Sequence, residues 1–191
     1  MSAIQQQKEE LRREILASRD TIPEEVWKRK SDQLVSQLME TDLFLKAQKI
    51  HCYVSMNQRR EVNTHSFIKK LLAADKEVYV PVTNFEDGTL SHVRLHSFDD
   101  LSPNIWGVLE PTDAEKVHID VFDLIIVPMV AADKQGNRLG YGKGFYDRFL
   151  SHTEGIKVGL VFERFVQKEI PTEDFDVKLD VLITNKGILK T

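Results

Sequence analysis

The sequence predicts a single α/β domain over residues 1–191, a three-layer sandwich in which helices flank a mostly parallel central sheet. Two observations support this fold class. Short apolar runs rich in β-branched and aromatic residues alternate with amphipathic helical segments. The run Leu124-Ile-Ile-Val127 is apolar at every position, which is typical of a strand buried on both faces of a parallel sheet. No linker or internal repeat divides the chain, whose length suits one domain.

Helices are expected over residues 4–19, from Thr21 to about Glu40, over 64–74 and over 144–151. The first has Leu11, Ile15 and Leu16 at helical spacing among charged residues, which gives a thin apolar stripe. The second begins with Thr21-Ile-Pro-Glu24, which matches a capping box with proline in the first turn.

Strands are expected over residues 50–55, 78–82, 90–95, 124–128, 157–162 and 181–184. Ligands of parallel α/β sheets bind where the strands end at their carboxyl side, so functional residues are expected after these strands. Residues 96–120 contain two prolines and scattered charge. They are expected to form an irregular excursion that serves as a flap.

Composition narrows the class of partner and the compartment. The formal net charge of -4 and the pI near 5.9 argue against a nucleic-acid partner, which usually needs a broad basic face. The single cysteine, Cys52, lies in an apolar run and is expected to be a buried, inert thiol in a reducing cytoplasm. The polar N-terminus predicts neither a signal peptide nor a membrane anchor. The six histidines show no metal-ligand spacing, so no zinc site is expected.

A glycine-rich stretch is the main functional signal. Four of the nine glycines, Gly136, Gly140, Gly142 and Gly144, fall within nine residues. Glycine allows positive φ and close approach to a ligand, and alternating glycines let successive N–H groups turn toward one anion. The stretch is expected to follow a buried strand and to lead into a helix whose positive end adds to these groups. The alternative is a tight strand-to-helix connection in which the glycines only permit close packing.

Charged residues around the glycines indicate a polyphosphate ligand. Arg138, Lys143 and Arg148 surround them and Asp147 is the only acid nearby, so a locally cationic pocket for ATP is expected. The usual nucleotide loop has a hydroxyl residue after its lysine, whereas Gly144 follows here, so magnesium needs another ligand. Asp147 is a candidate; alternatively it is a first-turn acid favoured by the helix dipole.

Two further cations are predicted to act together. Lys8 and Arg12 are four residues apart on the first helix, so they point in one direction. Alternatively they form a solvated helical face.

Three segments carry a family resemblance: Pro128-Met-Val-Ala-Ala-Asp133, Gly136-Asn-Arg138-Leu-Gly140 and Gly142-Lys-Gly-Phe-Tyr-Asp-Arg148. They resemble the signature region of the 5-formyltetrahydrofolate cyclo-ligases, also called methenyltetrahydrofolate synthetases. Weaker counterparts occur at Lys8 to Arg12, Ser55-Met56, residues 61–64 and Asp180. The resemblance implies a small monomeric enzyme that uses Mg-ATP to turn 5-formyltetrahydrofolate into 5,10-methenyltetrahydrofolate, with release of ADP and phosphate. The formyl oxygen takes the γ-phosphoryl group and N10 then attacks, so no covalent protein nucleophile is required.

The resemblance also implies residue roles. Lys143 and Arg138 would be catalytic. The ATP-binding set would be Lys8, Arg12, Arg138, Leu139, Gly140, Tyr141, Gly142, Lys143, Gly144, Phe145 and Tyr146. Asp147 and Asp180 would hold Mg²⁺, although Asp180 alone is an ordinary strand-edge acid. The folate would contact Met56, Glu61, Tyr141, Phe145 and Trp106.

Some of these roles have rivals from the residues alone. Glu61 is better explained as a surface acid paired with Arg59 or Arg60, and Trp106 could be a core residue of the flap. Phe145 stands where the family often has tyrosine, so a hydroxyl hydrogen bond is lost while stacking survives. Ala132 replaces a bulkier residue, which is expected to widen the pocket.

Two other functions fit the same loop. A small-molecule kinase would keep the ATP site and use another acceptor. A non-catalytic binding module would keep only the fold, but Arg138, Lys143, Asp147 and Asp180 are all present, which counts against it.

Overall fold

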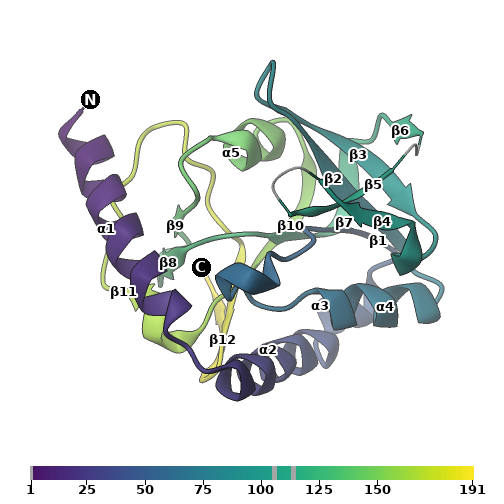
Figure 1. Cartoon of the computed structure of the whole chain (residues 1–191), viewed down its shortest axis with the longest axis horizontal. Helices are drawn as coiled ribbons and strands as arrows, with labels where there is room; N and C mark the ends of the chain where they lie inside the picture. The colour runs from purple at the N-terminus through teal and green to yellow at the C-terminus, as the bar shows by residue number, and fades with distance from the viewer. Residues whose placement is uncertain (1, 105–106, 113–114) are drawn as a thin grey trace.

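The central sheet dominates the structure (Figure 1). The computed structural model describes residues 2–104, 107–112 and 115–191. Within these residues the sheet has eight strands in the order β13-β12-β10-β7-β1-β2-β3-β6. Their bounds are β1 Lys49–Cys52, β2 Glu77–Asn84, β3 Thr89–Leu95, β6 Lys116–Val117, β7 Val121–Val127, β10 Glu154–Leu160, β12 Val181–Thr184 and β13 Gly187–Lys190. The five strands from β12 to β2 are parallel and the edges are antiparallel, so the predicted mostly parallel sheet is confirmed.

Apolar residues fix the middle of this sheet. Ile50 of β1 pairs with Leu124 of β7 on one side and Val78 of β2 on the other, and all three are fully buried. Val158 of β10 pairs with Ile126 of β7 in the same way. Strands that bury both faces favour apolar side chains on both, which explains the continuous apolar run in β7.

Helices cover both faces of the sheet, as the fold class predicts. Figure 1 shows α2, α3 and α4 along one face and α5 on the other, while α1 lies to the side of β8 and β9. The helices are α1 Ala3–Asp20, α2 Glu24–Met39, α3 Asp42–Lys46, α4 His65–Ala73 and α5 Phe145–Leu150, with 3-10 turns η1 Asn57–Arg59, η2 Phe98–Asp100 and η3 Glu163–Phe165. Four of the five helices were predicted, and the five-residue α3 is too short to show a helical period.

The predicted start of α2 is wrong in its detail. Pro23 occupies the N-cap position, and no side chain caps the helix. The hydroxyl of Thr21 instead donates to the Ser18 carbonyl and closes the end of α1. A capping box does occur at the start of α1, between Ser2 and Gln5.

Short strands were missed in three places, one of which is the edge strand β13. A small sheet of order β11-β8-β9 comprises β11 Val166–Gln167, β8 Ala131–Asp133 and β9 Arg138–Leu139. A hairpin of β4 Leu101–Pro103 and β5 Leu109–Pro111 lies in the 96–120 excursion, followed by β6. The glycine-rich stretch therefore does not follow the buried strand β7 directly, because the β8–β9 hairpin intervenes.

Helix α1 is attached in an unusual way. Its buried residues are Lys8, Ile15 and Arg19, so two of the three are basic. Leu11 and Leu16 pack against the core while partly exposed, which agrees with the predicted thin stripe. Within the described residues, no helix is both long and apolar enough to cross a bilayer.

A cluster of aromatic rings and two histidines lies beneath α5. The rings of His51 and His92 are 5.1 Å apart, and Phe149 of α5 packs 4.7 Å from His51 and 4.5 Å from His92. Neither ring nitrogen of His51 has a hydrogen-bond partner among the described residues. Burial and the neighbouring His92 lower the pKa of His51 well below its usual value, and burial lowers the pKa of His92 to about 4.

Candidate ligand-binding cavity

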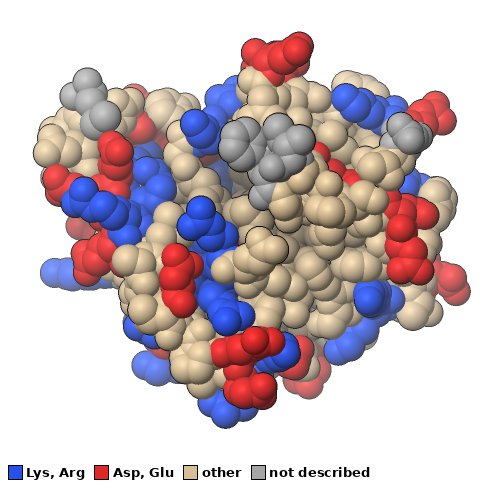
Figure 2. All heavy atoms as spheres, in the orientation of Figure 1, with Lys and Arg blue, Asp and Glu red and all other residues tan. Residues whose placement is uncertain are grey.

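A cavity of about 720 Å³ opens at the carboxyl ends of β1, β2 and β7. Parallel α/β sheets bind their ligands at the carboxyl ends of the strands, so the cavity lies where a ligand is expected. The walls come from α1, the segment after β1, the β2–β3 hairpin, the excursion, the glycine-rich stretch and residues 173–176. Figure 2 shows basic side chains gathered in the depression beside α1. Of the predicted site residues, the cavity is lined by Lys8, Arg12, Met56, Glu61, Arg138, Leu139, Gly140, Tyr141, Gly142, Lys143, Gly144, Phe145, Tyr146 and Asp147.

The glycine-rich stretch divides into a hairpin turn and a ligand-facing loop. Gly142 and Gly144 have positive φ angles of 87° and 70°, and the N–H groups of residues 142–144 have no acceptor among the described residues. Gly136 also has positive φ, but a Cβ there would lie 2.7 Å from the Leu179 carbonyl oxygen. Close packing in the hairpin therefore explains why glycine is needed at this position. The structure thus reduces the predicted four-glycine cradle, since Gly140 has ordinary φ and open space around it.

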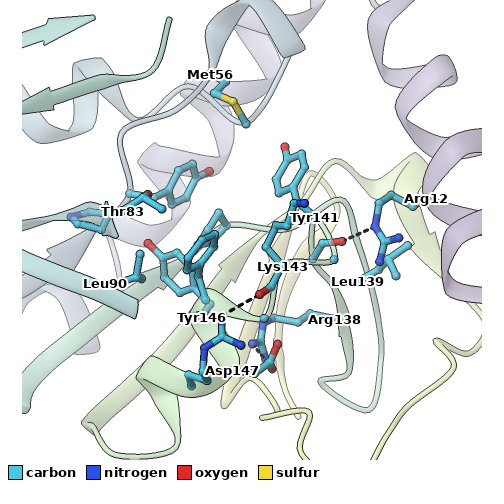
Figure 3. A pocket seen from close by; sticks show the side chains of 18 of the residues that line it. Arg12, Met56, Thr83, Leu90, Arg138, Leu139, Tyr141, Lys143, Tyr146 and Asp147 are labelled. Atoms are coloured by element: carbon cyan, nitrogen blue, oxygen red, sulfur yellow. Dashed lines mark hydrogen bonds and ion pairs between the residues drawn. The ribbon is translucent and has the colours of Figure 1, made fainter. Parts of the chain in front are cut away.

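Two arginines hold the carbonyl groups of this loop. Arg12 Nε donates to the Gly140 oxygen at 2.8 Å, and Arg148 Nη2 donates to the Lys143 oxygen at 2.9 Å. Arg148 Nε also donates to the Gly88 oxygen at 2.7 Å, which ties the β2–β3 hairpin to the loop. With the carbonyls directed at arginines, the loop N–H groups are left for a ligand. Figure 3 shows Arg12 bound to the loop backbone on one side and Lys143 between Arg12 and Tyr146.

The cavity is less cationic than the sequence predicts. Lys8 forms ion pairs with Glu173 at 3.1 Å and Asp176 at 2.5 Å, so the expected solvated or phosphate-facing lysine is neutralised by a distant acidic segment. By contrast, three cations keep their charge: Arg12 and Arg148 bind neutral backbone carbonyls, and Lys143 has no carboxylate partner among the described residues. The helix α5 has only six residues, so its dipole adds less than expected.

Arg138 and Asp147 form a buried pair at the base of the cavity (Figure 3). Arg138 is 8% exposed, and its Nη2 lies 2.5 Å from Asp147 Oδ1. The same oxygen accepts the Val177 N–H at 3.1 Å, and Arg138 Nη1 donates to the Val177 carbonyl. Asp147 therefore anchors the 173–178 segment to α5 and is more than a first-turn acid.

Asp180 lies elsewhere. Its carboxylate accepts the Lys157 N–H at 2.7 Å, where β10 and β12 begin, which is the opposite edge of the parallel sheet. It is not among the residues that line the cavity, and its side chain is half exposed. The structure therefore does not bring Asp147 and Asp180 into one site. Among the described residues, no group of three or more His, Cys, Asp or Glu side chains is placed to hold a metal ion.

Glu61 is buried and faces the cavity. It is 5% exposed; Oε2 accepts the Met56 N–H at 2.5 Å and Oε1 accepts the Tyr141 hydroxyl. Burial raises the pKa of this carboxyl above its usual value, while these hydrogen bonds oppose the rise. The interpretation of Glu61 as a surface acid paired with Arg59 or Arg60 is wrong, and Arg60 instead stacks on the Trp27 ring at 5.2 Å.

The aromatic residues of the loop have different settings. Tyr141 bridges Glu61 and Arg19, whereas Phe145 packs edge-on against Phe85 with ring centroids 5.8 Å apart. The Tyr146 hydroxyl is buried without a hydrogen-bond partner among the described residues. Leu139 is a core residue whose side chain only borders the cavity.

Two residues, Ala132 and Trp106, were predicted to shape or cover the cavity. Ala132 is fully buried in β8 and does not line the cavity, so the expected widening is wrong. Trp106 lies outside the described residues.

Sequence reasoning missed three parts of the site. Arg19 is seven residues after Arg12, so its place on the same helical face was available as a signal. The β2–β3 wall, with Thr83 and Leu90, follows from strand pairing that one sequence does not reveal. The acids at 173 and 176 meet Lys8 across more than 160 residues, and no local pattern marks them.

Fold and site define an α/β enzyme-like protein with a glycine-rich, partly cationic cavity at the carboxyl edge of its sheet. The sequence profile of the 5-formyltetrahydrofolate cyclo-ligase family matches residues 4–185. The chain belongs to this family, and it is therefore a ligase enzyme by descent.

Relatives agree with this assignment. The probable 5-formyltetrahydrofolate cyclo-ligase of Caenorhabditis elegans is 32% identical over 197 residues, with 96% of this chain and 95% of the relative covered. The 5-formyltetrahydrofolate cyclo-ligase of Haemophilus influenzae is 35% identical over 144 residues, 72% of this chain and 76% of the relative. The solved 5,10-methenyltetrahydrofolate synthetase of Aquifex aeolicus superposes with a TM-score of 0.84 at 34% identity, covering 96% of this chain and 92% of that one.

Proposed function

We propose that this protein converts 5-formyltetrahydrofolate to 5,10-methenyltetrahydrofolate with consumption of ATP, in the presence of Mg²⁺, and releases ADP and phosphate. The observation that carries the proposal is that one cavity holds both an anion-binding loop and a buried carboxylate of the kind that suits a pterin. The volume of about 720 Å³ lies in the range of cavities that hold small-molecule ligands.

The phosphate side is assigned to the loop. The unpaired N–H groups of residues 142–144, with Lys143 and Arg12 beside them, would receive the β- and γ-phosphates of ATP. Lys143 is the catalytic cation best placed for the transferring group, because it is exposed to the cavity and has no carboxylate partner among the described residues. Arg138 is already paired with Asp147 and would have to give up this ion pair to bind a phosphate. We therefore propose that Arg138 holds Asp147 in position.

Magnesium would enter with the nucleotide. Mg²⁺ commonly keeps several waters and uses one or two carboxylates plus substrate phosphates, and Asp147, three residues after Gly144, is the carboxylate that we propose for this role. When bound, the ion would neutralise charge on the β- and γ-phosphates. The position of Asp180 gives no support to its part in this site.

The folate side is assigned to Met56, Glu61 and the aromatic residues. Both carboxylate oxygens of Glu61 keep lone pairs for the amino and ring N–H groups of a pterin. Phe145 also lines the cavity and would contact the folate, and Trp106 remains a predicted contact outside the described residues.

The protein's share of the chemistry is positioning and charge stabilisation. The formyl oxygen attacks the γ-phosphorus and ADP leaves; N10 then attacks the formyl carbon, the C–O bond to phosphate breaks, and N10 loses its proton. Lys143 and the loop N–H groups would stabilise the transferring phosphoryl group. The cavity would hold N10 against the activated carbon, which replaces an intermolecular encounter with a positioned one.

The near-ultraviolet absorbance of methenyltetrahydrofolate provides the test. Wild-type protein with 5-formyltetrahydrofolate, Mg²⁺ and ATP should give an ATP-dependent increase, and Lys143→Ala should lose it. A stable phosphorylated product without the methenyl chromophore would instead show a small-molecule kinase. Absence of both products would also refute the proposal. We also propose a cytoplasmic monomer without a nucleic-acid partner: the acidic composition argues against nucleic acid and the free, buried Cys52 suits a reducing compartment, while sedimentation would test the monomeric state.

A further inference from the structure

Arg19 is a buried cation that the proposed reaction does not use. It is 2% exposed, it lies on α1, and it is not among the residues that line the cavity. Its Nη1 donates to the Met129 carbonyl at 3.4 Å, and its Nη2 donates to the Tyr141 hydroxyl at 2.5 Å. Removing a guanidinium from water is costly unless hydrogen bonds or an opposite charge compensate it. The acid that would compensate it here is Glu61, which accepts the hydrogen bond of the same Tyr141 hydroxyl.

The donors and acceptors in this chain of contacts have a fixed direction. Arginine has only donors, so the oxygen of Tyr141 must accept from Arg19. The single hydroxyl proton of Tyr141 is then committed to Oε1 of Glu61. Oε2 of Glu61 accepts the Met56 N–H, so each carboxylate oxygen receives one donor. This arrangement suits the ionised form of Glu61, because a protonated carboxyl would place a second donor against one already present.

We propose that Arg19 is a positioning residue for the folate side of the cavity: through the Tyr141 hydroxyl it holds Glu61 as an oriented carboxylate, without touching either substrate. The inference rests on the proposed function for the identity of the ligand. Tyr141 lies between Gly140 and Gly142, so the same contacts connect the carboxylate of Glu61 to the glycine-rich loop. Glu61 and Tyr141 border the cavity, whereas Arg19 acts from behind them.

The electrostatic surroundings give the proposal a measurable consequence. The ionisable groups that face Glu61 are Arg19, Tyr141, Tyr53 and Tyr146. Burial raises the pKa of Glu61, while Tyr141, the Met56 N–H and Arg19 lower it. Burial keeps all three tyrosines neutral by raising their pKa values, so Arg19 is the cation that opposes protonation of Glu61. Its removal should therefore raise the pKa of Glu61 further.

The first experiment measures Glu61 directly. The side-chain carboxyl of ¹³C-labelled glutamate would be titrated by NMR in the wild type, in Arg19→Met and in Arg13→Met, with Glu61→Gln used to assign the signal. Arg13 is an exposed arginine on the same helix and serves as the matched control. Arg19→Met should move the Glu61 titration upward by roughly one pH unit or more, and Arg13→Met should leave it in place. An unchanged titration in Arg19→Met would overturn the proposal.

Tyr141→Phe guards against failure of Arg19→Met to fold. It removes only one hydroxyl at a partly exposed position and cuts the same connection, so it should also raise the Glu61 titration. Arg19→Lys keeps the charge and should restore most of the wild-type titration. If neither Tyr141→Phe nor Arg19→Met moves the Glu61 signal, the positioning role is refuted.

The second experiment separates substrates. Between pH 6 and 8, Arg19→Met should raise KM for 5-formyltetrahydrofolate by roughly tenfold, most at the acid end, with KM for ATP changed by less than about threefold. Equal increases in the two KM values, or a decrease in kcat alone, would indicate general damage and contradict the proposal. If the wild type makes no methenyl product at all, the proposed function fails, whereas the NMR titration still decides the role of Arg19.

Discussion

The hairpin of residues 131–139 and the loop of residues 140–147 are adjacent in sequence but differ in how their polar groups are satisfied. In the hairpin, the fully buried Asp133 accepts N–H groups from Gln135, Asn137 and Ile170 at 2.8–3.0 Å. In the loop, the N–H groups of residues 142–144 have no acceptor among the described residues. The polar groups around Asp133 in the hairpin are thus satisfied within the protein, whereas, within the described part of the chain, three N–H groups of the loop are free to bind a ligand. Mutations should therefore affect stability in the first segment and activity in the second.

The largest effect is expected from Lys143→Ala in the loop. Loss of a preorganised cation at a transferring phosphoryl group typically costs about 10²–10³ in kcat, so activity should fall by that order. The side chain is exposed, so the melting temperature should hardly change. Steady-state formation of the methenyl chromophore is the measurement.

The hairpin supplies the matched control. Lys134 is an exposed lysine in the turn between β8 and β9, and Lys134→Ala should keep near-wild-type activity. Equal losses in the two variants would mean that general charge, rather than position in the loop, determines the rate.

The next largest effect is expected from Asp133→Asn, on stability. The new amide would direct a donor at N–H groups that now bind a carboxylate, so the free energy of unfolding should fall by about 2–4 kcal/mol. Urea titration would measure it. Activity per folded molecule should stay within about twofold, because Asp133 does not line the cavity. A selective loss of activity with unchanged stability would break the comparison between hairpin and loop.

Asp147→Asn should have a smaller, mixed effect. Asparagine can still accept the Val177 N–H, but it no longer pairs with the buried Arg138. We expect activity to fall by roughly tenfold and the magnesium concentration for half-maximal rate to increase, and the unpaired buried guanidinium of Arg138 to lower stability as well. Activity measured across a magnesium series would test this. An unchanged magnesium requirement would remove Asp147 from the metal site.

The smallest effect is expected beneath α5, in His51→Leu. The unfolded histidines take up protons below about pH 6.5, whereas folded His92 resists protonation until about pH 4, and burial also lowers the pKa of His51 well below its usual value. The unfolded state binds more protons in this range, so stability falls as pH drops from about 6.5 to about 4, by up to ~1.4 kcal/mol per pH unit for His92, and His51 adds a loss of the same sign. His51→Leu should reduce this slope and leave stability near pH 7.5 within about 1 kcal/mol, as measured by urea unfolding at several pH values. An unchanged slope would show that other groups cause the acid sensitivity.

The sequence was sufficient for six of the eight strands that the structure describes in the central sheet, and for most of the loop. The apolar strands and amphipathic helices carry strong periodic signals, and the glycines with Lys143 mark a loop whose place at the sheet edge follows from parallel topology. The strands β8 and β9 were missed because two or three residues are too few to show a period. The glycine pattern therefore merged a structural turn at Gly136 with a loop that lines the cavity.

Charge was the property that sequence predicted least well. Lys8 looks free in the sequence, but Glu173 and Asp176 neutralise it in the structure. Glu61 looks like a surface acid because Arg59 and Arg60 precede it, yet the chain turns so that Glu61 enters the cavity. Such pairings depend on which distant segments meet, and neighbouring residues in the sequence do not report them.

The attachment of α1 has a dynamic consequence. Ile15 is the helix's one fully buried apolar side chain, so its release would expose little apolar surface and should need less free energy than opening the sheet. Each such opening would break the bonds of Arg12 to Gly140 and of Arg19 to Tyr141 together. Amide hydrogen exchange should therefore be faster in α1 than in β7, and bound nucleotide should slow it. Helix α1 would then control access to the cavity as well as form one of its walls.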